Sequence, residues 1–287
     1  MLTEDAPAKV NLTLRVLGRR ADGYHAIESL VAFARFGDRL MFERADALEL
    51  DVRGPTACDA GGDADNLVVK ASRALARQCP GLRLGRFVLT KRLPVAAGLG
   101  GGSADAAAAL RLLARANRMA SDDARLMKAA RHTGADVPVC LVPRARSMAG
   151  IGDRLSRPIA LPTLPAVLVN PGVALATKDV FARLGRPRLQ AGPRNGLSQK
   201  VPTDRPALFA YLADHGNDLE AAAAALAPAV PRVLRALSRM PGCRLARMSG
   251  SGATCFGLFE SSRAATAAAR ALTEAHPRWW VKATMLQ

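Results

Sequence analysis

The sequence predicts an α+β fold of one large domain or two medium ones, in which a glycine loop leads into a central helix. Stretches with strand-like alternation and stretches with helical periodicity are mixed along the chain without a regular βαβ period. The length of 287 residues is enough for one large domain or two medium ones. Near the centre, four glycines (98, 100, 101 and 102) lead directly into an alanine-rich stretch that favours helix.

In the first half of the chain, alternating apolar and polar residues predict strands, and apolar residues at helical spacing predict helices. The Gly37-Asp38 pair is expected to interrupt a strand, Asn66 to cap one helix and Ser121 to cap another. The strands are expected at 7–17, 26–36, 39–52, 86–92 and within 134–142, and the helices at 67–78, at 103–117 and after Ser121.

In the second half, a proline-rich stretch at 157–165 marks the predicted boundary between two domains, residues 1–157 and 158–287. A second proline-rich stretch, 185–206, is expected to be a surface loop. Strands are expected at 166–170, within 244–260 on both sides of a second glycine loop at 249–253, and at 279–285, and helices at 177–184, 206–214, 217–239 and 262–275.

The net charge of +17, from 41 basic and 24 acidic residues, leaves three explanations open. It is compatible with nucleic-acid binding, with anionic small substrates, or with a biased amino-acid composition. The arginines are scattered through every segment, and only 4% of residues are aromatic. A basic tail and an aromatic stacking platform are both missing from the sequence, so we expect no nucleic-acid partner.

Cysteine usage and hydropathy narrow the class of protein further. The five cysteines are far apart and form no C-x-x-C pair, which predicts reduced thiols and no structural zinc site. No apolar run approaches the ~20 residues of a membrane span. The first residues carry acids where a signal peptide would be basic and apolar. We therefore expect a cytoplasmic protein with no membrane partner.

The central glycine loop has the properties of a phosphate site. Glycine allows positive φ angles and lets a ligand approach the backbone, and the first turn of a helix offers free N–H groups and a partial positive charge. Ser103 is expected either to cap the helix or to point its hydroxyl at a phosphate or its metal. The simpler alternative is a flexible turn before a core helix. The loop matches neither the Walker A motif nor the dinucleotide fingerprint.

Three stretches together carry more information than the glycine loop alone. They are PAKVNLTL at 7–14, PVAAGLGGGSADA at 94–106 and SGSGATCF at 249–256. In this order they resemble the three motifs of the GHMP kinase superfamily, named for galactokinase, homoserine, mevalonate and phosphomevalonate kinases. The resemblance covers nearly the whole chain. It implies a two-domain α+β architecture, with the active site in the cleft between the domains.

Four further stretches resemble one branch of this superfamily. They are GRRADGYH at 18–25, DNLVVKA at 65–71, KRLP at 91–94 and GADVPVCL at 134–141. The resemblance implies phosphoryl transfer from ATP, with Mg²⁺ expected, to the 2-hydroxyl of cytidine-diphospho-methylerythritol in the non-mevalonate route to isoprenoids. We expect a monomer or a homodimer.

The resemblance assigns Asp136 as the catalytic base and Lys9 as the lysine beside it. Read alone, an aspartate in a Gly-Ala-Asp turn is usually only a turn residue, and a lysine at a strand start is usually solvated. Asn66 and Lys91 match positions near the nucleoside. The residues expected to hold ATP are Pro94, Val95, Ala96, Ala97, Gly98, Leu99, Gly100, Gly101, Gly102, Ser103 and Ala104.

The resemblance also assigns the substrate side of the site. Tyr24 and His25 match the pair that receives cytosine, because a tyrosine ring can stack and a histidine can hydrogen-bond the base edge. Phe181 resembles the second stacking ring and Thr177 a neighbouring polar contact, although a phenylalanine in a short helix is most often a core residue. Asn11 is expected at the methylerythritol hydroxyls. We expect no metal-ligand residues.

Two departures from the family pattern concern Ala96 with Ala97, where more glycine is typical, and Ala149, where a charged residue is common. A methyl group in the loop narrows the available backbone conformations. Neither departure touches the catalytic pair. Two alternatives remain open, a different GHMP kinase such as homoserine or mevalonate kinase, and a basic nucleic-acid-binding protein.

Overall fold

The computed structural model describes residues 1–59, 65–185 and 200–287, and the chain divides into two compact units. Each unit draws on segments that are distant in the sequence. Unit 1 consists of Met1–Lys9, Phe36–Val95 and Gly100–Pro143, and unit 2 of Val10–Arg35, Ala96–Leu99 and Arg144–Gln287. The domain boundary at 157/158 and the cleft between domains stay predictions.

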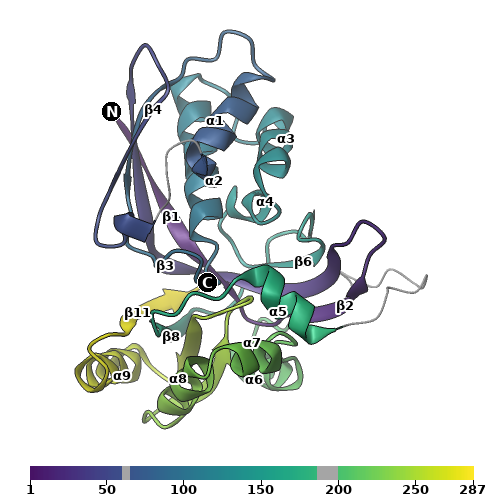
Figure 1. Cartoon of the computed structure of the whole chain (residues 1–287), viewed down its shortest axis with the longest axis vertical. Helices are drawn as coiled ribbons and strands as arrows, with labels where there is room; N and C mark the ends of the chain where they lie inside the picture. Colours follow the sequence, from purple (N-terminus) through teal and green to yellow (C-terminus); the bar gives the residue numbers. More distant parts are fainter. Residues whose placement is uncertain (60–64, 186–199) are drawn as a thin grey trace. The chain divides into compact units, whose positions relative to one another are not determined.

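The sheet of unit 1 is built on the second half of β3 (His25–Arg44). β5 (Gly85–Thr90) pairs antiparallel with it, β4 (Glu49–Arg53) pairs parallel with β5, and β1 (Leu2–Asn11) also pairs with β3. Burial alternates along β5, as expected for a strand with one face on the core. Figure 1 shows the helices of this unit gathered beside the sheet.

The predicted break at Gly37-Asp38 is wrong, because β3 runs through it without interruption. A Cβ atom on Gly37 would lie 2.1 Å from the carbonyl oxygen of Ala6 and 2.5 Å from the Cα of Pro7. Glycine is required here because β1 passes very close to β3, and not because the chain turns. Asp38 is fully buried beside it.

The helices of unit 1 are α1 (Leu67–Ala76), α2 (Gly101–Ala116), α3 (Ala124–Thr133) and the short α4 (Val137–Cys140), preceded by a 3₁₀ turn at Ala57–Asp59. Helix α1 packs against both α2 and α3. Helix α2 is buried around most of its circumference, and its many alanines allow neighbouring helices to approach closely.

Two predictions about this region are wrong in detail. Asp123, and not Ser121, caps α3, and its side chain accepts the N–H of Arg125. The predicted strand within 134–142 is helix α4. A short apolar run does not distinguish a buried strand from a buried helical turn, and Pro138 fits the first turn of a helix.

Unit 2 contains two groups of strands. β2 (Arg15–Arg19) and β6 (Arg146–Gly150) pair antiparallel with the first half of β3, and β7 (Arg154–Leu155) pairs with β6. The other group has the order β11-β8-β10-β9, with every neighbouring pair antiparallel. Its strands are β8 (Leu164–Asn170), β9 (Cys243–Met248), β10 (Cys255–Phe259) and β11 (Trp280–Leu286). Leu286 at the end of β11 pairs with Ala34 of β3.

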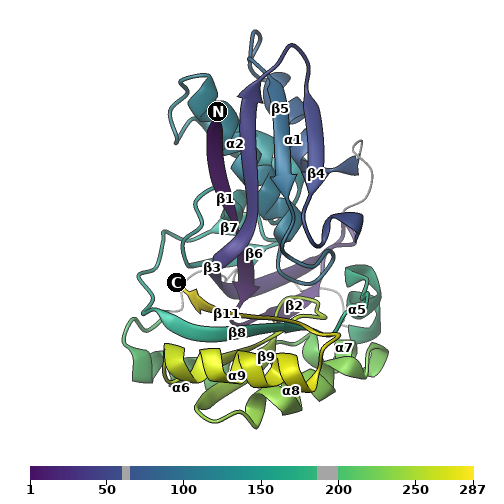
Figure 2. The same ribbon diagram turned by 90° about the vertical axis from the view of Figure 1, so that its left-hand side faces the viewer.

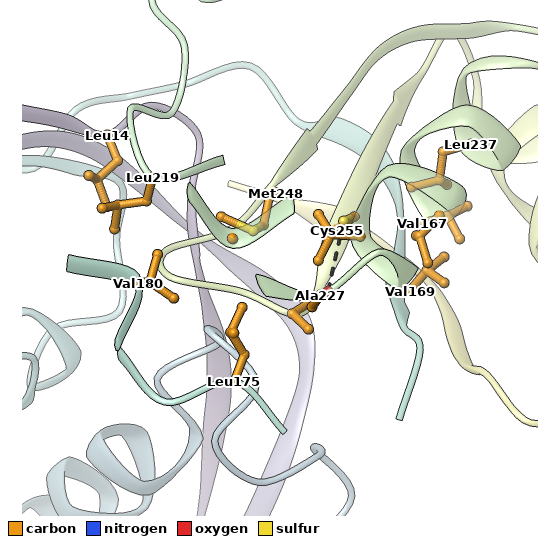
Figure 3. Close-up of a cluster of buried hydrophobic side chains, with 14 of the residues drawn as sticks. Leu14, Val167, Val169, Leu175, Val180, Leu219, Ala227, Leu237, Met248 and Cys255 are labelled. Atoms are coloured by element: carbon orange, nitrogen blue, oxygen red, sulfur yellow. Dashed lines mark hydrogen bonds between the residues drawn. The ribbon is translucent and has the colours of Figure 1, made fainter. Parts of the chain in front are cut away.

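Helices α8 and α9 pack on this second group of strands, as Figure 2 shows. The core between them includes Val167 and Val169 of β8, Met248 of β9 and Cys255 of β10 (Figure 3). The helices of unit 2 are α5 (Thr177–Leu184), α6 (Arg205–Asp214), α7 (Glu220–Leu226), α8 (Ala229–Ser238) and α9 (Ser262–Ala275).

The predictions for unit 2 are mostly confirmed. The bounds of α5 and α9 are as predicted, whereas the predicted helix 217–239 is divided into α7 and α8, with Pro228 at the residue that precedes α8. Most of the predicted loop 185–206 lies outside the described residues. In the part of the chain that the structure describes, no helix is long and apolar enough to cross a membrane.

Candidate active site

Unit 1 brings together the two residues expected to be catalytic. Lys9 lies near the end of β1 and Asp136 caps α4, and the Lys9 Nζ is 3.1 Å from the Asp136 Oδ2. The lysine side chain is 5% exposed and the aspartate side chain 37% exposed. The ammonium is therefore held inside the unit, while the carboxylate is open to a ligand.

Gly100 places this pair beside the start of α2. It is the N-cap of α2 with φ of +62°, and a Cβ atom there would lie 3.1 Å from the Cε of Lys9. The stem of Lys9 thus lies against the residue from which α2 begins. Because Gly100 has no side chain, it cannot cap the first N–H groups, and they keep their affinity for an anion.

The expectation that Ser103 caps the helix is wrong. Helix α2 begins two residues earlier, at Gly101, so Ser103 lies inside its first turn. The backbone of Ser103 is already helical there. The alternative, that its hydroxyl points at a phosphate or its metal, stays a prediction.

The preceding part of the loop, Ala96–Leu99, belongs to unit 2 and packs on the second glycine loop. Thr254 N–H donates to the Ala97 carbonyl at 3.2 Å, and the Ser249 hydroxyl donates to the Gly98 carbonyl at 2.9 Å. A Cβ atom on Gly98 would lie 2.4 Å from the Ser249 carbonyl oxygen. Only glycine fits at this close approach, where φ is +75°.

Asn11 is joined to the second glycine loop. Its backbone N–H donates to the Ser249 hydroxyl at 3.1 Å, and its side-chain amide donates to the Ser29 hydroxyl at 2.8 Å. Ser29 in turn donates to the Thr13 carbonyl. Asn11 is buried in this network. Its expected contact with the methylerythritol hydroxyls stays a prediction.

Unit 2 contains the residues expected on the cytosine side of the site. The rings of His25 and Phe181 are stacked, with centroids 4.7 Å apart and an interplanar angle of 25°. Thr177, one turn before Phe181 on α5, shares a 2.8 Å hydrogen bond with Ser251. Tyr24 is 62% exposed, and its stacking on a base stays a prediction.

The charge of the His25 ring is set by its surroundings. Partial burial, with a smaller effect of the Arg19 charge, lowers the pKa of His25. The ring is therefore neutral at pH 7, and it presents one hydrogen-bond donor and one acceptor.

The two residues expected near the nucleoside have structural partners. The Asn66 side chain accepts the N–H of Val68 at 3.0 Å and so caps α1. The Lys91 ammonium is buried and donates to the carboxylates of Asp38 and Asp105. Contacts of either residue with a nucleotide stay predictions.

Sequence reasoning missed Asp38 and Asp105. Asp38 was expected in a turn, and Asp105 was not singled out within the alanine-rich helix. One signal was present, because an aspartate surrounded by small apolar residues on a buried helix needs a partner. Among the described residues, no group of three or more histidine, cysteine, aspartate or glutamate side chains could hold a metal.

Comparison with known proteins identifies the family. Residues 66–144 match the GHMP kinases N terminal domain, and residues 203–278 match the GHMP kinases C terminal domain. The chain is 58% identical to the 4-diphosphocytidyl-2-C-methyl-D-erythritol kinase of Xanthobacter autotrophicus, over 98% of both chains. It is 56% identical to the enzyme of that name from Azorhizobium caulinodans, over 100% of this chain and 99% of the relative.

The chain belongs to the 4-diphosphocytidyl-2-C-methyl-D-erythritol kinase family of GHMP kinases. A crystal structure titled as 4-(cytidine 5'-diphospho)-2C-methyl-D-erythritol kinase matches with a TM-score of 0.79 and 36% identity, and the match covers 99% of both chains. A homoserine kinase from Cytophaga hutchinsonii matches with a TM-score of 0.70 at 19% identity, which shows a shared fold alone. The predicted α+β GHMP kinase fold is confirmed.

Proposed function

We propose that this GHMP kinase transfers the γ-phosphoryl group of ATP to the 2-hydroxyl of 4-diphosphocytidyl-2-C-methyl-D-erythritol. The observation that carries the proposal is the Lys9–Asp136 pair beside Gly100, at the uncapped start of α2. A phosphate site, a cation and an open carboxylate then lie within one unit. Relatives that carry this activity in their names extend over nearly the whole chain.

In this proposal the start of α2 binds the phosphates, and Lys9 balances the charge that develops during transfer. Phosphoryl transfer depends mainly on positioning and on electrostatic stabilisation. Asp136 accepts the proton of the attacking hydroxyl and orients that hydroxyl toward the γ-phosphorus. The buried Lys9 ammonium, 3.1 Å from the Asp136 Oδ2, orients the carboxylate.

We propose that magnesium enters with the nucleotide as part of the MgATP substrate. Magnesium keeps several of its waters and is usually held through substrate phosphates with one or two carboxylates, not in a cage made by the protein alone. Magnesium would neutralise phosphate charge during transfer.

For the acceptor, we propose that Tyr24 stacks on cytosine, and that the neutral His25 ring hydrogen-bonds its edge. Phe181 already stacks on His25 and would complete an aromatic site, and Thr177 supplies a polar contact on the same helix. Asn11 is held by Ser249 and Ser29 and would meet the methylerythritol hydroxyls. We keep as expectations a cytoplasmic monomer or homodimer that binds no nucleic acid.

A coupled kinase assay with three acceptors tests the proposal. The purified protein, MgATP and either cytidine-diphospho-methylerythritol, homoserine or mevalonate are compared at equal concentrations. We expect turnover with the cytidine substrate and background rates with the other two. The Asp136→Asn protein, prepared identically, controls for contaminating kinases. Faster turnover of homoserine or mevalonate would identify a different GHMP kinase. Salt-sensitive duplex binding without turnover of any acceptor would favour a nucleic-acid-binding protein.

A further inference from the structure

A second group of charges lies within unit 1, and the catalytic chemistry above makes no use of it. Lys91 follows β5, Asp38 lies in the middle of β3 and Asp105 lies in the second turn of α2. The Lys91 Nζ is hydrogen-bonded to the Asp38 Oδ2, and it is 2.7 Å from the Asp105 Oδ2. We call these three residues the Lys91 cluster. It joins the sheet of unit 1 to helix α2, which begins in the central glycine loop.

The Lys91 cluster is sealed from water and anchored to the backbone. All three side chains are at most 5% exposed. The Asp38 Oδ1 also accepts the backbone N–H groups of Arg92 and Leu93, which fixes the turn that follows β5. A buried ion pair keeps one geometry because any other arrangement leaves a charge without a partner. The Lys91 cluster is therefore a rigid connection.

The Lys91 cluster lies next to the first residue of α2, where the phosphate site is proposed. A Cβ atom on Gly101, the first residue of α2, would lie 3.5 Å from the Lys91 Nζ and 3.6 Å from the Asp38 Oδ2. On the neighbouring residue, a Cβ atom on Gly100 would instead touch Lys9. At the start of α2, Gly100 therefore lies against Lys9, and Gly101 lies against the Lys91 cluster.

The charges of the Lys91 cluster bear on the same site. Two ionised carboxylates and one ammonium would place a net negative charge under a turn that binds phosphate. Burial, opposed by Lys91 and reinforced by Asp38, raises the pKa of the Asp105 carboxyl to about 8. One proton is therefore retained at pH 7, and the cluster is neutral overall. The helix keeps its positive end for the ligand.

We propose that Asp38 and Asp105 are positioning residues that act through Lys91 to hold the first turn of α2 where its N–H groups meet the phosphates of ATP. This inference rests on the proposed kinase function. It assigns Lys91 to the support of the phosphate site, whether or not the ammonium also touches the nucleotide. Both aspartate side chains are buried and hydrogen-bonded to the Lys91 ammonium.

The test uses Asp38→Asn in the full-length protein. An asparagine keeps the shape and can still accept the N–H groups of Arg92 and Leu93, but its amide NH₂ then faces the Lys91 ammonium. Because the amide NH₂ and the Lys91 ammonium are both hydrogen-bond donors, they repel each other. Lys91 then moves away from residue 38 and no longer holds α2 against the sheet. We expect the Kd of a non-hydrolysable ATP analogue, measured by calorimetry, to rise at least tenfold. The KM for ATP should rise in parallel, with the KM for the cytidine substrate unchanged.

Asp51→Asn is the matched control. Asp51 lies in the same sheet, and its carboxylate pairs with Arg53 and Arg86 at the surface. We expect this variant to bind the ATP analogue as the unmodified protein does. If Asp38→Asn does not fold, Asp105→Ala takes its place, because alanine favours helix and removes one acceptor of the Lys91 ammonium.

The readout separates positioning from a merely structural role. A smaller fraction of folded protein lowers the apparent kcat and leaves the KM for ATP unchanged. Displacement of the first turn of α2 raises the KM for ATP. An unchanged Kd for the analogue in a folded Asp38→Asn or Asp105→Ala protein would overturn the inference. A different result would contradict the proposed function: the unmodified protein binds the ATP analogue but does not phosphorylate the cytidine substrate.

Discussion

Unit 1 contains two groups of lysine and aspartate that differ in their access to water. Asp136, the partner of Lys9, is about one-third exposed, whereas Asp38 and Asp105, the partners of Lys91, are sealed inside. Both groups contact the same helix start, one at Gly100 and the other at Gly101. The residue types alone do not distinguish them.

The difference shows what a buried charge can do. A carboxylate that reaches the surface can exchange a proton with a substrate, and its lysine fixes its direction. A carboxylate enclosed with its lysine meets no substrate, so it acts only through the backbone that it holds. The predictions below test this division, beginning with the largest expected effect.

Removing the two lysines should give very different losses of stability. Lys91→Met leaves the Asp38 carboxylate buried without its cation and the Asp105 carboxyl without its hydrogen-bond donor, and breaking a buried ion pair typically costs about 3–5 kcal/mol. Lys9→Met leaves Asp136 partly open to water, so we expect a loss below about 2 kcal/mol. Urea unfolding of both variants measures the difference. Lys70→Met, which removes an exposed pair with Asp65, is the control.

Asp136→Asn should remove activity and leave the fold intact. The asparagine keeps the shape but cannot accept the proton, and we expect kcat to fall at least ~10²-fold, the lower end for general acid–base catalysis. The Kd for the ATP analogue should stay within about twofold, because the start of α2 and the Lys91 cluster are unchanged. Steady-state kinetics with calorimetry gives both values, and a near-normal kcat would remove Asp136 from the mechanism.

The two members of the open pair should act together. The double variant Lys9→Met with Asp136→Asn is expected to lose less transition-state stabilisation than the sum of the two single losses, because each residue depends on the other. Strictly additive losses in kcat would show that Lys9 works independently of Asp136. The comparison needs kcat from all four proteins under saturating ATP.

The buried Asp105 carboxyl should make the stability of the protein depend on pH. The pKa of Asp105 is raised to about 8 in the folded protein, from about 4 in an unfolded chain. The folded state binds more protons between these values, so this carboxyl lowers stability as pH rises from about 4 to about 8. Asp105→Asn cannot titrate. Its unfolding free energy, relative to the unmodified protein, should therefore increase with pH; a constant difference would contradict the assignment.

The glycine loop offers a smaller contrast between an exposed and a buried residue. Ala96 is exposed and has φ of +50°, a conformation that disfavours side chains, whereas Ala97 is buried and outside that region. We expect Ala96→Gly to stabilise the protein by up to about 1 kcal/mol and Ala97→Gly to destabilise it by about as much. Thermal unfolding of the two variants measures the signs. The same sign in both would show that φ is not the cause.

Local patterns predicted much of the fold. The bounds of α5 and α9 follow from helical spacing of apolar residues, and the cap on α1 follows from Asn66. The errors arose where a tertiary contact overrode the local signal. Gly37 lies within a strand because β1 needs the space, and the apolar run after Asp136 is a helical turn.

The candidate site was predictable in its residue types and only partly in its arrangement. The structure places Lys9 beside Asp136 and stacks the His25 ring on Phe181, and the roles that the motifs imply for these residues stay predictions. By contrast, the motifs placed Lys91 near a nucleoside, and the structure joins its ammonium to two aspartates. No local pattern links these three residues, which are 53 and 14 positions apart.

The sequence by itself determined the alternation of strands and helices, the glycine-rich start of α2 and the three motifs of a GHMP kinase, because each depends on residues close together in the chain. Only the tertiary structure decided which charges meet and which of them reach water. Folding brings β1, β3 and α2 into contact. Asp136 stays partly exposed and is a candidate base, whereas Asp38 and Asp105 become buried around Lys91. Those outcomes depend on desolvation, which is a property of the packed chain and not of its neighbouring residues.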